Sequence, residues 1–252
     1  MASTTKRHPA RIKARFAADE GGRLTSVEFH GDFDTGAYAS WGPTVANRVP
    51  VHAMGPYRVP AVRCTSAAIY TNGPPAGAFR GFGVPQAAIA HEALMDELAH
   101  KLGQDPLEFR VANALRVGDR TATGQLLEAS AGLPKCLEAL RPHWRRLRAD
   151  AEAHNRSGGI VRHGVGIGCM WYGIGNTSLS NPSAMRVGLA RDGRVTLYSG
   201  AVDIGQGSNT IMLQICADGL GVPVAQLALV AGDTDRTPDA GKTSASRQTF
   251  VS

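Results

Sequence analysis

Residues 77–83, Gly-Ala-Phe-Arg-Gly-Phe-Gly, constrain the fold most, because they join a turn-rich stretch to a helical pattern that starts near Gln86. Three glycines leave the backbone free to adopt positive φ and to approach a ligand closely. Between them Phe79, Arg80 and Phe82 offer two aromatic faces and one planar cation. The pattern predicts either a ligand-gripping loop at a helix N-terminus or a plain strand-to-helix connection, which is the commoner case.

A second glycine-rich turn, residues 203–207, has the sequence Asp-Ile-Gly-Gln-Gly and again precedes a helical pattern. Backbone N–H groups and the positive end of a helix dipole would meet there, which suits a phosphate or a polarised oxygen. The amide of Gln206 adds a donor and an acceptor without charge. A tight turn without a ligand is the alternative interpretation.

The third motif, residues 241–248, combines small residues with the hydroxyls of Thr243, Ser244 and Ser246 and ends in Arg247 and Gln248. Consecutive N–H groups and hydroxyls of this kind can converge on an anion. Such a composition is also typical of a flexible solvent loop.

These motifs, in this order, resemble the molybdopterin-binding large subunit of the xanthine dehydrogenase and aldehyde oxidase family. The resemblance rests on Ala-Phe-Arg-Gly-Phe-Gly followed by Pro-Gln, then Gly-Gln-Gly, then the Ser/Ala-rich loop, and it runs from Lys6 to Ser252. It implies an α+β fold with α/β elements, built as two mixed sheet-and-helix halves and truncated at both ends. The expected domains are 1–120 and 133–252, with a linker at 121–132.

The resemblance also implies roles for individual residues. The backbone of Arg80 would lie near molybdenum, Phe82 would stack on a flat substrate, and Arg48 would face the substrate. The position of Arg48 before the turn at 57–60 carries that last assignment, and a plain surface arginine remains the equal alternative. The residues implied in cofactor binding are Phe79, Arg80, Gly81, Gly205, Gln206, Gly207, Ser244, Ala245, Ser246, Arg247 and Gln248.

The implied reaction is hydroxylation of an aldehyde or an N-heteroaromatic carbon with oxygen derived from water. The cofactor would be molybdenum-molybdopterin, with the cytosine dinucleotide as one of its forms, because the cofactor carries the difficult chemistry in such enzymes. Iron–sulfur and FAD groups would belong to other domains or subunits, which are the expected partners, and the expected compartment is the cytoplasm.

The chain also departs from the family pattern. The family's general base is a glutamate in a Gly-x-Gly-Glu motif, and the chain reaches Ser252 before any such motif. An upstream loop of the cofactor cradle is missing too, so we expect an internal fragment that is inactive by itself. We expect Glu92 and Glu97 to face solvent and not to replace the base. A non-catalytic anion-binding remnant or a subunit-association module is the alternative function.

Composition excludes other classes. The net charge of +6 is spread along the chain, so nucleic acid is not an expected partner, and the basic run 141–148 is interpreted as a solvated helix face. No apolar run is long enough for a membrane span. The cysteines lie too far apart to indicate a metal site and are expected to be buried free thiols. His91 and His100 are expected to be ordinary helix histidines.

Hydrophobic periodicity and turn residues predict the remaining elements. Asp105 is expected to cap a helix that begins at Pro106 and ends near Gly118. Residues 34–50 are expected to form a long loop or short helix. The other predicted helices are 86–102, 134–154 and 208–220, and the predicted strands are 11–16, 24–29, 62–71, 160–172, 185–189, 194–198 and 226–231.

Overall fold

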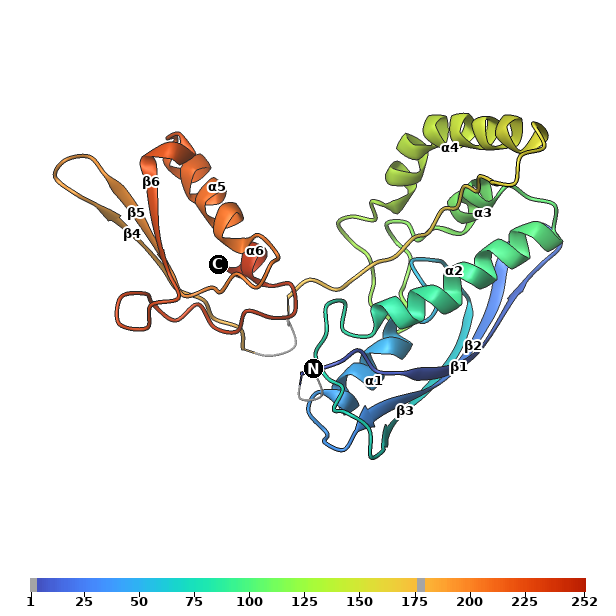
Figure 1. Cartoon of the computed structure of the whole chain (residues 1–252), viewed down its shortest axis with the longest axis horizontal. Helices are drawn as coiled ribbons and strands as arrows, with labels where there is room; N and C mark the ends of the chain where they lie inside the picture. The colour runs from blue at the N-terminus through green and yellow to red at the C-terminus, as the bar shows by residue number, and fades with distance from the viewer. Residues whose placement is uncertain (1–3, 176–179) are drawn as a thin grey trace. The chain divides into compact units, whose positions relative to one another are not determined.

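A computed structural model describes residues 4–175 and 180–252 of the chain (Figure 1). Backbone contacts divide it into a first unit, Met1–Tyr172, and a second unit, Gly173–Ser252. Each unit contains one sheet of three strands with helices packed on it.

The sheet of the first unit has the strand order β1-β2-β3. Strands β1 (Ala10–Ala18) and β2 (Leu24–Gly36) form the predicted antiparallel hairpin, and β3 (Ala61–Tyr70) runs parallel to β2. Helix α1 (Gly42–His52) connects the two parallel strands. Of the segment 34–50, predicted as a long loop or short helix, residues 42–50 are helical and include Pro50, and residues 34–36 belong to β2.

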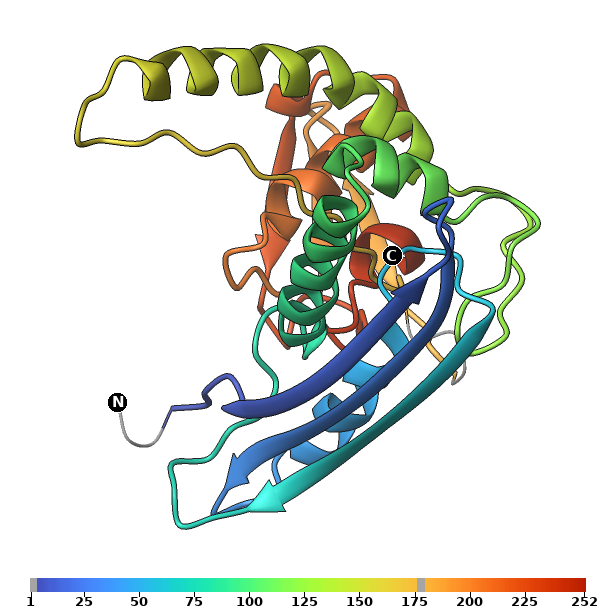
Figure 2. The same cartoon turned by 90° about the vertical axis from the view of Figure 1, so that its right-hand side faces the viewer.

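Helices α1 and α2 (Val84–Lys101) pack against the sheet and against each other. In Figure 2 both helices lie behind the sheet, whose other face is toward the viewer. Phe29 and Phe33 of β2 share a buried cluster with Val49 of α1 and Ala87 of α2. Strand residues thus alternate between this apolar layer and an outer face that carries charged side chains.

Helix α3 (Pro106–Asn113) begins where the sequence predicts. The Asp105 carboxylate accepts the N–H groups of Leu107 at 2.9 Å and Glu108 at 3.2 Å. The helix ends at Asn113, several residues before the predicted end.

Helix α4 (Leu133–Arg156) packs against α3 through residues of the basic run. Arg148 pairs with Asp105 at 2.6 Å, and Arg141 pairs with Glu108. The interpretation of residues 141–148 as a purely solvated face is therefore wrong for these arginines, which join two helices.

Residues 160–172 do not form the predicted strand. Glycines at 164, 166 and 168 alternate with apolar residues and imitate a period of two. The segment lacks a neighbouring strand, and at Cys169 its backbone bonds to side chains of α2 instead. It is an extended, irregular segment of the first unit.

The second unit has the strand order β4-β5-β6, with β4 (Met185–Leu189) antiparallel to β5 (Val195–Ser199) and β6 (Leu227–Ala231) parallel to β5. Helix α5 (Ser208–Leu220) connects β5 to β6 through the 3-10 turn η1 (Val224–Gln226). It ends at Gly221 in the left-handed conformation, as predicted. The short helix α6 (Gln248–Val251) packs on α5.

The α+β fold class is thus confirmed, with two mixed three-stranded sheets and helices. The division between the two compact units falls between Tyr172 and Gly173 in the chain. The linker predicted at 121–132 stays a prediction. Among helices of the described ranges, none combines the length and the apolar composition that a membrane span requires.

Candidate cofactor-binding site

The first motif forms a strained turn that leads into α2. Gly81, Phe82 and Gly83 all have positive φ, at 88°, 46° and 94°. The Phe82 N–H donates to the Phe79 carbonyl at 2.8 Å, and the Val84 N–H donates to the Gly81 carbonyl at 2.9 Å. The turn is therefore held by its own backbone in a conformation that a phenylalanine rarely adopts.

Packing against α1 requires one of the glycines. A Cβ on Gly83 would lie 2.6 Å from Cγ2 of Val49 and 3.1 Å from the Val45 carbonyl oxygen. The turn and α1 consequently approach each other at a distance that leaves no room for a side chain.

The outer side of this turn presents donors. Arg80 and Phe79 are exposed, and no described residue accepts a hydrogen bond from the backbone N–H of Arg80 or Gly81. Phe82 packs edge-on against Trp41, with ring centroids 6.2 Å apart. Open N–H groups beside an exposed cation suit an anionic or polarised ligand.

Residues 7 and 86, which the sequence argument did not select, support the turn. Arg7 donates to the Arg80 carbonyl at 2.5 Å, and its guanidinium lies 4.7 Å from the Phe79 ring centroid. Gln86 accepts from Arg7 at 3.3 Å and donates to the His8 carbonyl at 3.2 Å. The sequence feature that could have indicated Gln86 is the Pro-Gln pair that follows the first motif.

The second motif differs from the expectation because its donors are already occupied. The Asp203 carboxylate accepts the N–H groups of Gly205 at 2.8 Å and Asn209 at 3.2 Å, and the Gly205 bond is the largest cause of a lowered Asp203 pKa. Gln206 donates to the Val202 carbonyl at 2.9 Å and accepts the Ile204 N–H at 2.6 Å. The amide of Gln206 thus closes its own turn.

In the third motif, two side chains hold the loop from inside. Arg247 is buried and donates to the carbonyls of Ala240 at 2.7 Å and Pro182 at 2.7 Å. The Gln248 amide donates to the Ala240 carbonyl at 3.2 Å and to the Lys242 carbonyl at 3.1 Å. The Arg247 guanidinium and the Gln248 amide thus donate to carbonyls of the protein itself, and the predicted phosphate-side contacts of these residues stay a prediction.

In the third motif Ser244 and Ser246 are exposed, and Ala245 between them is half-buried. Ala245 and Ser246 both have φ of 54°, and no described residue accepts a hydrogen bond from their backbone N–H groups. The Thr243 hydroxyl accepts the Val202 N–H at 3.0 Å. The second and third motifs are therefore neighbours within the second unit.

Backbone strain coincides with the motifs. In the described ranges, the non-glycine residues with positive φ are Ser40, Phe82, Ala245 and Ser246. Three belong to the first and third motifs, and a Cβ on Gly77 of the first motif would lie 2.6 Å from Oγ of Ser40. Each such residue costs about 1–3 kcal/mol, and strain of this kind concentrates at ligand sites.

Comparisons with known proteins indicate the family of the chain. Family models described as molybdopterin cofactor-binding domains match residues 1–114 and 137–252. The chain is 51% identical over 138 residues to the nicotinate dehydrogenase large molybdopterin subunit of Eubacterium barkeri, covering 55% of this chain and 32% of that protein. It is 37% identical over 256 residues to the xanthine dehydrogenase molybdenum-binding subunit of Escherichia coli O157:H7, covering 99% of this chain and 33% of that protein.

A solved structure gives the same result. The aldehyde oxidoreductase from Desulfovibrio desulfuricans matches with a TM-score of 0.84 at 32% identity, covering 98% of this chain and 27% of that chain. The chain belongs to the xanthine dehydrogenase and aldehyde oxidoreductase family of molybdopterin-binding proteins. It spans about a third of the length of the relatives it matches.

The open donors of each unit, taken separately, fit the family's cofactor. The N–H groups of Arg80 and Gly81 in the first unit can donate to oxygens of a pterin or a phosphate, and those of Ala245 and Ser246 in the second unit can do the same. Groups of three or more His, Cys, Asp or Glu side chains able to hold a metal ion do not occur among the described residues.

Arg48, which the resemblance predicts to face the substrate, lies on α1 and is half-buried. Its guanidinium lies 5.1 Å from the ring centroid of Tyr172. His52 donates from Nδ1 to the Arg48 carbonyl at 3.1 Å. Burial lowers the pKa of His52 to about 4, so this ring is neutral near pH 7.

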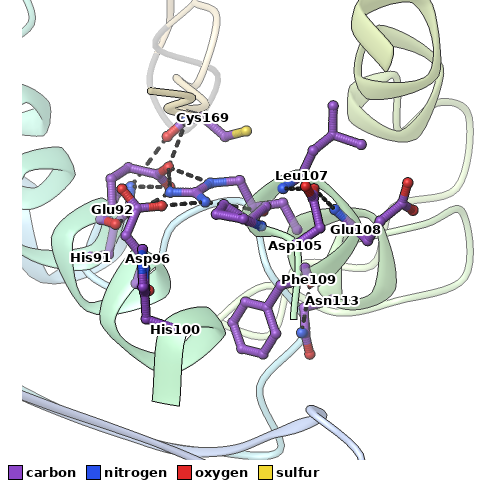
Figure 3. Close-up of polar contacts among 12 residues, drawn as sticks. His91, Glu92, Asp96, His100, Asp105, Leu107, Glu108, Phe109, Asn113 and Cys169 are labelled. Carbon is purple, nitrogen blue, oxygen red and sulfur yellow. Dashed lines mark hydrogen bonds and ion pairs between the residues drawn. The ribbon is translucent and has the colours of Figure 1, made fainter. Parts of the chain in front are cut away.

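The expectation for Glu92 is wrong, whereas Glu97 is 61% exposed as predicted. The Glu92 side chain is only 14% exposed, and it accepts from the Tyr57 hydroxyl at 2.6 Å and from Arg110 Nε at 2.9 Å. It also accepts from the Cys169 N–H at 2.9 Å (Figure 3). Arg110, eighteen residues away, neutralises it. Helical periodicity alone could not reveal that partner.

The cysteines are free, and their exposure varies. Cys169 is buried as predicted, Cys64 and Cys216 are half-buried, and Cys136 is exposed, which corrects the prediction of buried thiols. Burial raises the pKa of Cys64 to about 11, so this thiol is not reactive near pH 7. His91 is buried on α2 and His100 is exposed.

Proposed function

We propose that this chain forms much of the cofactor cradle and part of the substrate wall of a molybdenum hydroxylase. The substrates would be aldehydes or N-heteroaromatic compounds. The observation that carries the proposal is the coincidence of strained residues with the motifs, at Phe82, Ala245 and Ser246. Strained backbone persists only where the surrounding structure fixes it, and it is common where a ligand must be gripped.

Different residues of the chain would bind different parts of the cofactor. The N–H groups of Arg80 and Gly81 would hold the pterin-borne metal group, with Arg7 fixing the Arg80 carbonyl. In the second unit, residues 244–246 would donate from their own N–H groups to an anionic group of the cofactor, while Arg247 keeps their loop in shape. The bound cofactor would supply the redox chemistry that inserts water-derived oxygen.

Phe82 and Arg48 would form the substrate wall. The Phe82 ring is held against Trp41 and can stack on a flat substrate. Arg48 can pair with an oxygen of the substrate. Two relatives are named as a molybdenum-binding subunit and a large molybdopterin subunit, which supports partners carrying the iron–sulfur and FAD groups.

We expect no turnover from the isolated chain. Within the first unit, the Glu92 carboxylate is largely shielded from solvent, and Arg110 and Tyr57 occupy its oxygens. A carboxylate held in this way is a poor general base, since its charge is already stabilised.

Metal content tests the proposal most directly. The protein that contains this chain, produced with cofactor supply, should hold molybdenum and oxidise a member of a panel of aldehydes, a purine and nicotinate. Ser246→Asp should lower the molybdenum content roughly tenfold, because a new negative charge repels an anionic ligand by about 1–4 kcal/mol. Thr249→Asp adds the same charge on exposed α6 and should retain the metal.

The alternative, a non-catalytic remnant or association module, predicts a different result. A folded protein without molybdenum, or equal metal content in the two variants, would contradict the proposed cradle.

A further inference from the structure

Two arginines of the first unit, Arg110 and Arg48, are shielded from solvent to different degrees and differ in their hydrogen-bond partners. Arg110 is fully buried, and its donors reach Glu92, Asp96 and the Pro106 carbonyl. Arg48 is half-buried, but its guanidinium makes no hydrogen bond or ion pair with any described residue. Arginine carries five N–H donors, so a half-buried guanidinium without acceptors is suited to receive a ligand.

An aromatic cluster determines where this guanidinium lies. Tyr172 covers it at 5.1 Å, and His52 stacks on Tyr172 with ring centroids 5.7 Å apart and planes inclined by 17°. Trp171 contacts the His52 ring with centroids 4.8 Å apart. Burial is the largest cause of the lowered pKa of His52, and the nearby Arg48 charge lowers that pKa further, so the neutral His52 ring avoids repulsion with Arg48.

The segment that carries Tyr172 has no strand partner to hold it. Residues 161–163 of this segment bond to His154 and Asn155 of α4. Nearer to Tyr172, a clamp holds the backbone of Cys169, whose N–H donates to Glu92 at 2.9 Å and whose carbonyl accepts from His91 Nε2 at 3.3 Å (Figure 3). Glu92 is itself fixed by Arg110 and Tyr57. The clamp lies three residues before Tyr172, so little chain is left to move freely.

We infer that Tyr172, held by the Glu92 clamp on Cys169, positions the Arg48 guanidinium for the substrate. The inference rests on the proposed function. In this arrangement Glu92 acts through Tyr172 and touches neither substrate nor cofactor. Tyr172 sets how tightly the site binds a substrate whose oxygen accepts from Arg48.

Kinetics of the complete, cofactor-loaded enzyme test the role of Tyr172. Tyr172→Leu removes the aromatic face and should raise KM for the best panel substrate about 2- to 30-fold with little change in kcat, the range expected for a lost cation–π contact. Tyr172→Phe keeps the ring and should recover most of the loss. A change in folding alone would not separate KM from kcat in this way.

Amide hydrogen exchange tests the clamp without any turnover. Glu92→Gln removes the charge that holds the Cys169 N–H and should accelerate exchange in the peptide 167–172 and raise KM. Glu97→Gln, on the exposed face of the same helix, should change neither quantity.

The outcomes separate this inference from the proposed function. If Tyr172→Leu leaves KM unchanged, or if Glu92→Gln leaves the exchange unchanged, the inference is overturned. A wild-type enzyme that still holds molybdenum and turns over would then leave the proposed function standing. A wild-type protein without metal or turnover would refute the proposed function, while hydrogen exchange would still judge the clamp.

Discussion

The turns that precede α2 and α5 have similar sequences but different physical supports. Each places a glycine in the left-handed conformation immediately before its helix, Gly83 with φ of 94° and Gly207 with φ of 81°. Gly83 is pressed against Val49, whereas a Cβ on Gly207 would meet nothing within 4 Å. Packing against α1 together with its own backbone hydrogen bonds fixes the first turn, whereas the side chains of Asp203 and Gln206 fix the second.

The difference decides which backbone donors remain open. In the second turn Asp203 accepts the N–H groups of Gly205 and Asn209, and no carboxylate performs that role at Arg80 and Gly81. A turn held by packing can leave its N–H groups to a ligand, because its conformation does not depend on them. Glycine-rich turns before helices are thus not equivalent binding sites.

The largest expected effect is a difference between matched alanine substitutions. Gly83→Ala should destabilise the protein by about 3 kcal/mol or more, because positive φ and a clash with α1 act together. Gly207→Ala meets open space and should cost only about 1–2 kcal/mol. Urea unfolding measures both, and equal losses would contradict the packing argument.

Removing the charge of Asp203 should give a smaller, pH-dependent effect. Its backbone hydrogen bonds, chiefly from Gly205, lower its pKa below the ordinary 3.8. The resulting stability is present above that ordinary value and is lost as pH falls through the lowered folded value. Asp203→Asn should therefore lower Tm at pH 7, and the difference should shrink below about pH 4.

If the Tm difference between wild type and Asp203→Asn does not change between pH 7 and pH 3, the carboxylate does not support the second turn electrostatically. Asp218→Asn is a control, because that aspartate is exposed on α5 of the same unit and its carboxylate bonds to no described residue.

The smallest expected effect comes from relieving strain in the third motif. Ala245→Gly should stabilise the cofactor-free protein by about 0.5–1 kcal/mol, since glycine adopts a φ of 54° without a steric penalty. Ala93→Gly, at an exposed position of α2, should instead destabilise by about 1 kcal/mol. Thermal unfolding of both variants checks the sign, and a loss of stability in Ala245→Gly would show that its conformation is not strained.

Local elements were predictable where the chemistry is local. Asp105 followed by Pro106 predicted the start of α3, because an N-cap needs only its own carboxylate and the next N–H groups. Gly221 predicted the end of α5 for a similar reason. The motif order likewise indicated the family, which the domain matches confirm.

Errors arose where distant partners decide the outcome. The alternation in residues 160–172 predicted a strand, but a strand needs a neighbour, and Glu92 and His91 took the Cys169 backbone groups instead. The same contact explains why Glu92 is buried. The residues that neighbour Glu92 in the sequence do not indicate that its side chain contacts Arg110 and Cys169.

By itself the sequence determined the family, the α+β class and the positions of most helices and hairpins, because these depend on periodicity, caps and short motifs. Only the tertiary structure decided which motif groups stay open, as at Arg80 and Ser246, and which turn inward, as at Gln206 and Arg247. The reason is that a donor is free or occupied according to the acceptors that folding brings to it, and those acceptors lie outside the motif's own local pattern.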